Sequence, residues 1–256
     1  MQRNWILLTK VLLLLAACAS TAIAQDSSDP GKSAAQHFAE GVASHNARDF
    51  EQAIVSFKKA IELKPDFAEA YCSLGSEYYQ VQNFELAIEV LHRALQLRPN
   101  YAVALNNLGA ALLETGKPQE AIAAYERAIA LEPSRAEIRS NLARALSQLG
   151  HYDAALGQLE NAVKLKPHFC EAYNNMGVAY FHKGMYKRAK NSFLQAIKLN
   201  QEYADAIYNL GVVELARKQK SEAIAQYQRL KNLNSGLAVT LYDGMYKGMI
   251  LDLRNK

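Results

Sequence analysis

The sequence predicts an all-α protein built from six stacked helix-turn-helix repeats followed by a capping helix. Three observations predict this fold: a register of 34 residues that runs from 34 to 237, small residues in fixed slots of that register, and proline where most units end. A period of this length is typical of proteins in which each unit buries its apolar face against its neighbours.

Two slots of the register hold small residues. The first slot contains Gly41, Gly75, Gly109, Ala143, Gly177 and Gly211, and the slot twelve residues later contains alanine in all six units. Residues without a large side chain allow two helices to cross closely. A third slot contains Phe57, Leu91, Tyr125, Leu159, Phe193 and Tyr227. Together these slots form an apolar stripe at helical spacing.

Each unit is predicted to consist of a helix, a short turn and a second helix. Proline closes four units at Pro65, Pro99, Pro133 and Pro167, where it cannot continue the preceding helix. Glycine marks the turn between the two helices at Gly116, Gly150 and Gly184. The predicted units are 34–67, 68–101, 102–135, 136–169, 170–203 and 204–237. The last unit is degenerate, since Glu214 occupies a slot that holds tyrosine or leucine in units two to five.

The chain resembles tetratricopeptide-repeat proteins. The resemblance rests on a pattern that includes Tyr71, Leu74, Gly75, Tyr78, Ala87, Leu91, Ala94 and Pro99. It implies a right-handed superhelical solenoid in which the first helix of each unit lines a concave groove that binds protein.

The first 24 residues have the three-part pattern of a signal peptide. Two basic residues, Arg3 and Lys10, precede an apolar run that covers 11–17, and small residues precede Gln25. Two processing outcomes remain open: cleavage before Gln25, or lipidation at Cys18, because 15–18 resembles the lipobox of bacterial lipoproteins. We therefore expect an exported protein, periplasmic or secreted, with an outer-membrane lipoprotein as the alternative.

The segments that flank the repeats have simpler interpretations. Residues 25–33 are polar and contain Pro30 and Gly31, which predicts a flexible spacer. Residues 238–256 are predicted to form a capping helix and a tail, because the end of a repeat stack needs a cover. A dimer contact is the alternative for this helix, and the sequence does not determine the oligomeric state.

Composition and motifs argue against several function classes. Without residues 1–24 the chain would hold 27 basic and 25 acidic residues, and no basic block is interleaved with aromatic residues. We therefore expect no nucleic-acid partner, and membrane contact only through a lipid anchor. The chain contains no His-Glu-x-x-His, Cys-x-x-Cys, glycine-rich phosphate loop or Gly-x-Ser-x-Gly motif. The sequence predicts no enzymatic activity, no cofactor and no metal.

A row of asparagines is the main candidate binding site. With the glycine slot facing the partner helix, one concave row contains Asn107, Asn141, Asn175 and Asn209, and a neighbouring row includes Asn106 and Asn174. A carboxamide can pair with the backbone of an extended peptide. The row resembles the asparagine ladder of O-linked N-acetylglucosamine transferase repeats, which holds protein substrates. The alternative is that these amides form hydrogen bonds between neighbouring helices.

Hydrogen bonds alone cannot order a flexible peptide, so apolar anchors are required. The candidates near the same face are Phe38, Tyr79, Leu113, Phe181 and Tyr208, with Arg144 and His182 as polar contacts. The predicted function is an exported adaptor that binds an extended protein segment. A lipid-anchored assembly factor for pili or secretion machinery is one alternative, and a subunit that delivers substrates to a separate envelope enzyme is another.

Overall fold

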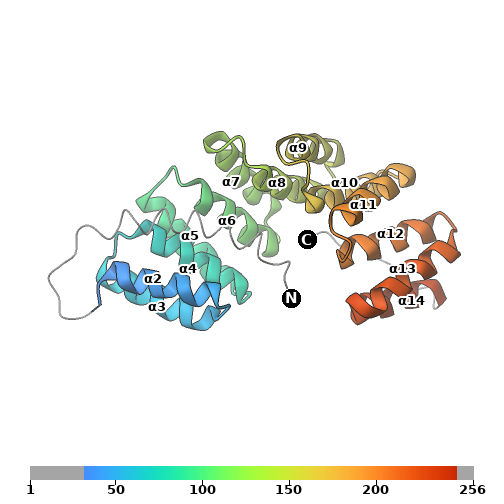
Figure 1. Ribbon diagram of the computed structural model, residues 1–256. Helices are drawn as coiled ribbons and strands as arrows, with labels where there is room; N and C mark the ends of the chain where they lie inside the picture. Colours follow the sequence, from blue (N-terminus) through green and yellow to red (C-terminus); the bar gives the residue numbers. More distant parts are fainter. Residues whose placement is uncertain (1–31, 247–256) are drawn as a thin grey trace. The chain divides into compact units, whose positions relative to one another are not determined.

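The computed structural model describes residues 32–246 (Figure 1). This part of the chain contains thirteen α-helices and no strand, as the sequence predicts. The helices are α2 (Ala34–Asn46), α3 (Phe50–Leu63), α4 (Ala68–Gln80), α5 (Phe84–Leu97), α6 (Ala102–Glu114), α7 (Pro118–Leu131), α8 (Ala136–Gln148), α9 (Tyr152–Leu165), α10 (Cys170–His182), α11 (Tyr186–Leu199), α12 (Ala204–Ala216), α13 (Lys220–Leu233) and α14 (Ser235–Tyr246). The first helix of each hairpin starts at the first residue of a predicted repeat.

The chain divides after Leu131 into two compact units. The first unit contains three hairpins, formed by helices α2 to α7, and the second contains three more together with α14 (Figure 1). Within each unit the second helix of one hairpin packs against the first helix of the next. The predicted signal peptide, most of the predicted spacer and the possible lipidation site Cys18 lie outside the described residues.

The slots that hold small residues allow the two helices of a hairpin to approach closely. A Cβ atom added at Gly177 would lie 2.5 Å from the ring of Phe193, and one added at Gly75 would lie 2.5 Å from Leu91. Real carbon atoms do not approach this closely, so the large residue of the second helix fills the space that the glycine leaves. The pattern of small and large slots in the sequence therefore corresponds to direct contacts in the core.

Helix α14 covers the apolar side of the last hairpin, as predicted. Its residues Leu237, Ala238 and Leu241 are buried in the same cluster as Leu210 of α12. The side chain of Leu241 also lies 2.7 Å from the position that a Cβ atom at Gly211 would take. The helix starts at Ser235, three residues before the predicted boundary.

The turns within the hairpins share one backbone conformation. Gly116, Gly150 and Gly184 have φ between 71° and 76°, and three non-glycine residues at the corresponding position have φ near 60°. Glycine adopts this left-handed conformation without steric cost, which explains its use in these turns. Between residues 32 and 246, no helix is long and apolar enough to cross a lipid bilayer.

Candidate functional site

The asparagine row forms hydrogen bonds between the first helices of consecutive hairpins. The Nδ2 atom of Asn209 on α12 donates to Oδ1 of Asn174 on α10 at 2.9 Å. Asn175 on α10 donates in the same way to Oγ of Ser140 on α8 at 3.2 Å. Donor and acceptor are 35 residues apart in both cases, so the amides link neighbouring repeats. This geometry supports the alternative that part of the row is structural.

The same pattern recurs more weakly in the first unit. Nδ2 of Asn107 on α6 lies 4.0 Å from Sγ of Cys72 on α4, again 35 residues away. Nδ2 of the neighbouring Asn106 donates to Oδ1 of Asn107 at 3.3 Å. Sulfur is a weak acceptor, so this link contributes less than the oxygen-accepting bonds of the second unit.

Burial separates the asparagines into two groups. Asn174 and Asn209 are fully buried, and Asn175 is 6% exposed. Asn106, Asn107 and Asn141 are half-buried. The second group is therefore partly exposed to solvent, whereas the first group is covered.

Three of the predicted apolar anchors are buried in the core, contrary to the expectation that they face a ligand. Phe38 is 1% exposed because its ring packs against Phe57 at 5.5 Å and Phe67 at 5.0 Å. Leu113 is 3% exposed, and Tyr208 is 1% exposed within the apolar cluster of the second unit. The face of a single helix does not determine the burial of such a side chain, because the second helix of the hairpin and the loop before the next hairpin can cover it, as they do at Phe38.

The remaining predicted contacts are half-buried or exposed. In the first unit, Tyr79 is half-buried and its hydroxyl donates to Oε1 of Glu114 at 3.3 Å. In the second unit, Phe181 and Arg144 are half-buried and His182 is exposed. The ring of His182 stacks on Tyr152 with a centroid distance of 5.3 Å and an interplanar angle of 4°. His182 therefore lies beside the turn that starts α9 as well as at the end of its own helix.

Two buried carboxylates were not predicted as features of the molecule. Glu77 is 2% exposed, and its Oε1 atom lies 2.8 Å from Nδ1 of His45. Glu214 is equally buried, and its Oε1 atom lies 3.2 Å from Nζ of Lys190. The hydrogen bond with Glu77 raises the pKa of His45, whereas burial raises the pKa of Glu214. The signal in the sequence was a charged residue in a slot that is apolar in most other repeats.

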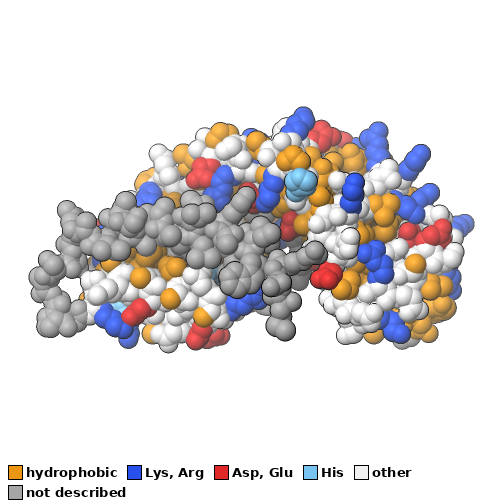
Figure 2. Space-filling model, in the orientation of Figure 1, with side chains coloured by type: hydrophobic (Ala, Val, Ile, Leu, Met, Phe, Trp, Pro, Cys, Tyr) orange, Lys and Arg blue, Asp and Glu red, His pale blue; other side chains and the backbone are white. Residues whose placement is uncertain are grey.

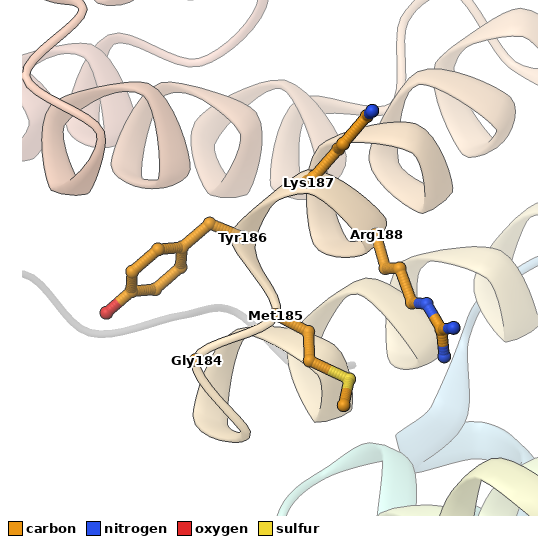
Figure 3. Close-up of a pocket in the computed structure, with 5 residues that line it drawn as sticks. All are labelled: Gly184, Met185, Tyr186, Lys187 and Arg188. Carbon is orange, nitrogen blue, oxygen red and sulfur yellow. The ribbon is translucent and has the colours of Figure 1, made fainter.

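A shallow depression of about 460 Å³ lies at the turn between α10 and α11. It is lined by Gly184, Met185, Tyr186, Lys187 and Arg188, which are consecutive in the chain. Their side chains point outward in different directions rather than toward a common centre (Figure 3). Among the described residues, no three His, Cys, Asp or Glu side chains are close enough together to hold a metal ion. The depression therefore lacks the convergent polar groups of a small-molecule site.

Five family models that describe tetratricopeptide repeats match the chain. They match residues 49–81, 66–134, 112–176, 170–203 and 205–235. The chain matches no curated protein.

Three of the solved structures that are similar to this chain are those of MamA, PilW and YrrB. The crystal structure of the MamA protein is 30% identical, with a TM-score of 0.57, and the match covers 67% of this chain and 93% of MamA. PilW, described as a widely conserved type IV pilus biogenesis factor, is 19% identical, with a TM-score of 0.75 and coverages of 82% and 98%. YrrB, described as a protein with an unusual peptide-binding site, is 24% identical, with a TM-score of 0.53 and coverages of 73% and 97%.

Proposed function

Because the chain belongs to the tetratricopeptide-repeat family, we propose that it is an exported, non-enzymatic adaptor that binds an extended segment of a partner protein. The proposed contacts are the accessible polar and aromatic residues on the first helices of the hairpins. The similar structure of YrrB is described as having an unusual peptide-binding site, which supports a protein ligand for this chain. The signal-like pattern of residues 1–24 supports export.

The observation that carries the proposal is the half-buried pair Asn106 and Asn107 on α6. Their amides lie 3.3 Å apart, and the hydrogen bonds of Asn107 to Asn106 and Cys72 use one donor and one acceptor of its carboxamide. A carboxamide has two donor hydrogens and two acceptor lone pairs, so Asn107 retains capacity for a peptide backbone. Tyr79, on the preceding first helix, supplies an aromatic surface in the same unit.

The second unit offers a similar combination on α8. Asn141 and Arg144 are three residues apart, which places them on the same face of the helix. Both are half-buried, and the positively charged guanidinium of Arg144 can donate hydrogen bonds to an acidic side chain or a carbonyl of the ligand. Phe181 is the accessible aromatic residue on the next first helix.

The experiment that tests this proposal is selection of extended peptides from a random library with the full chain. Asn107→Ala should weaken binding of a selected peptide that the first unit binds, and Arg144→Ala that of one that the second unit binds. The expected loss is about 2- to 12-fold in each case, since one hydrogen bond contributes about 0.5 to 1.5 kcal/mol. Lys164→Ala, at an exposed position near the end of α9, is the matched control. Selected peptides that bind all three variants with the affinity of the natural chain would show that the groove is not the binding site.

A lipid-anchored assembly factor is the second candidate. It is favoured by the lipobox-like residues 15–18 and by the similarity to the pilus biogenesis factor PilW. The mass of the mature N-terminus separates the two candidates. A chain that starts at Gln25 supports the soluble adaptor, and a diacylated Cys18 supports the anchored factor.

A further inference from the structure

Charge is distributed unevenly between the two units. Residues 32–131 contain nine Lys and Arg against twelve Asp and Glu, whereas residues 132–246 contain fifteen against ten. In the second unit the excess is concentrated in the turns of its last two hairpins. Residues 183–188 and 217–222 each contain three basic residues, and the corresponding segments of the other four hairpins contain at most one.

Five of these basic side chains form an exposed surface, which we call the basic edge. Its members are Lys187, Arg188, Arg217, Lys218 and Lys220. No acidic residue of the described part forms an ion pair with any of the five. The sixth basic residue of these turns, Lys183, pairs with Asp153 and is not included. Figure 2 shows Lys and Arg side chains projecting from the region of α10, α11 and α12.

Contacts within the unit place both turns on the same edge. The ion pair of Lys190 with Glu214 joins the start of α11 to the end of α12. The Nζ atom of Lys220 lies 4.0 Å from the ring centroid of Tyr246, so the last described residue of α14 is beside the start of α13. The basic edge therefore extends over two hairpins and reaches the capping helix.

Exposed apolar and aromatic side chains accompany these charges. Met185 and Tyr186 are 39% and 37% exposed in the turn before α11, and Tyr246 is 52% exposed beside Lys220. Tyrosine has an apolar ring and a polar tip, which suits the boundary between water and the acyl chains of a membrane. Basic side chains beside such residues are typical of proteins that bind anionic lipid surfaces.

We propose that the basic edge docks the second unit on a membrane surface that contains anionic phospholipid. An extended acidic peptide would need a groove with converging partners. The side chains of Lys187 and Arg188 instead point outward in different directions, as Figure 3 shows. Exposed basic side chains near helix ends need no groove to contact the headgroups of an anionic lipid surface. The inference is independent of the groove, because it uses none of the residues proposed to bind peptide.

The test measures binding of the full chain to phosphatidylcholine vesicles with and without phosphatidylglycerol. The readout is the ratio of the two affinities, compared between the natural chain and each variant, so that any contribution of residues 1–24, which all of these chains share, cancels. Lys187→Glu combined with Lys220→Glu should lower this ratio at least about 25-fold, since each basic residue near an anionic surface contributes about fivefold. Both positions are in the first turn of a helix, where an acidic residue is compatible with the helix dipole.

The matched control is Lys164→Glu combined with Lys198→Glu. These exposed lysines lie near the C-terminal ends of α9 and α11, whereas the two edge lysines lie near the N-terminal ends of their helices. The control makes the same change in net charge as the edge variant. The ratio should remain within about twofold of that of the natural chain, because charges beyond a Debye length of about 10 Å are screened at 0.1 M salt. Thermal unfolding by circular dichroism checks that both variants are folded.

Three results would overturn the proposal. The first is equal binding of the natural chain to both kinds of vesicle. The second is an equal loss of the ratio in the edge and control variants, which would indicate an effect of net charge alone. The third is binding to immobilised polyglutamate that the edge variant loses, without any preference for the anionic vesicles, which would identify an acidic protein as the partner.

Discussion

Replacement of the buried ion pair between the last two hairpins by an apolar pair should leave the protein as stable or more stable. Lys190 and Glu214 occupy two slots that hold Ile88 and Leu112 in the second and third repeats. The change is therefore Lys190→Ile combined with Glu214→Leu, which restores a combination that the chain already uses. Substitution of a buried ion pair by apolar residues of similar volume is typically neutral or stabilises by about 1 to 4 kcal/mol.

The geometry of the pair sets the expected magnitude. The side chain of Glu214 is 3% exposed and that of Lys190 is 24% exposed, so most of the desolvation cost falls on the carboxylate. Burial raises the pKa of Glu214 despite the ion pair, which means that the protein disfavours its charged form. Gln226 donates to Oε2 of Glu214 at 3.5 Å and would lose this weak bond. We expect the double variant to gain about 0 to 2 kcal/mol, at the lower end of the general range.

The single variants and pH provide the controls. Lys190→Ile alone leaves a buried carboxylate without its cation, and loss of one partner of such a pair typically costs about 3 to 5 kcal/mol. A carboxyl group with a raised pKa in the folded state contributes stability below its ordinary pKa, which is lost as pH rises through the raised value. The difference in unfolding free energy between the natural chain and the double variant should therefore grow in favour of the variant as pH rises from about 4 to 7.

Urea unfolding followed by circular dichroism measures the total effect, and hydrogen exchange of α12 amides measures it locally. Local exchange is needed because a chain that contains two compact units does not have to unfold in one two-state transition. A double variant that is less stable than the natural chain by more than about 1 kcal/mol would refute the reasoning, since the ion pair would then outweigh its desolvation cost.

Two further changes test the hairpin core and the other buried carboxylate. Gly177→Ala should cost about 1 to 3 kcal/mol in urea unfolding, because the new methyl group overlaps Phe193. Addition of Phe193→Leu should recover part of that cost, as alanine faces leucine in the corresponding slots of the fourth hairpin, and a strictly additive loss would contradict this explanation. His45→Gln should flatten the pH dependence of stability: the pairing with Glu77 raises the pKa of His45, so its contribution is complete below about pH 6.5 and is lost as pH rises through the raised value. Unfolding free energies at pH 6 and pH 9 measure this, and an unchanged difference between them in the variant would exclude the pair as its source.

The sequence predicted the hairpins because their determinants are local and periodic. Gly177 and Phe193, sixteen residues later, meet across one hairpin, and this contact does not depend on the neighbouring repeats. The turn glycines adopt a left-handed backbone conformation without steric cost, and their position in the repeat predicts the turn. These features depend on one repeat at a time, so a one-dimensional pattern captures them.

The prediction of the binding site was less successful because accessibility depends on neighbouring repeats. Phe38 was predicted to face the groove, yet Phe67, in the loop between α3 and α4, packs against its ring. The amide of Asn209 is chemically suited to a peptide backbone, but Asn174 of the preceding repeat accepts from it. The basic edge was not predicted for the same reason. Arg188 and Lys218 are 30 residues apart in the sequence, and the acidic residues between them lower the net charge of the whole segment.

The second unit therefore has two candidate surfaces that can be separated experimentally. The groove residues Asn141 and Arg144 lie on α8, whereas the basic edge starts at Lys187 after the turn that follows α10. His182, beside that turn and stacked on Tyr152, is the predicted groove residue nearest to the edge in the sequence. Charge reversal at the edge should change vesicle binding and leave peptide affinity intact, and Arg144→Ala should do the opposite. A variant on either side that changes both properties would show that peptide and membrane binding are coupled, and His182 would be the first residue to examine as the link.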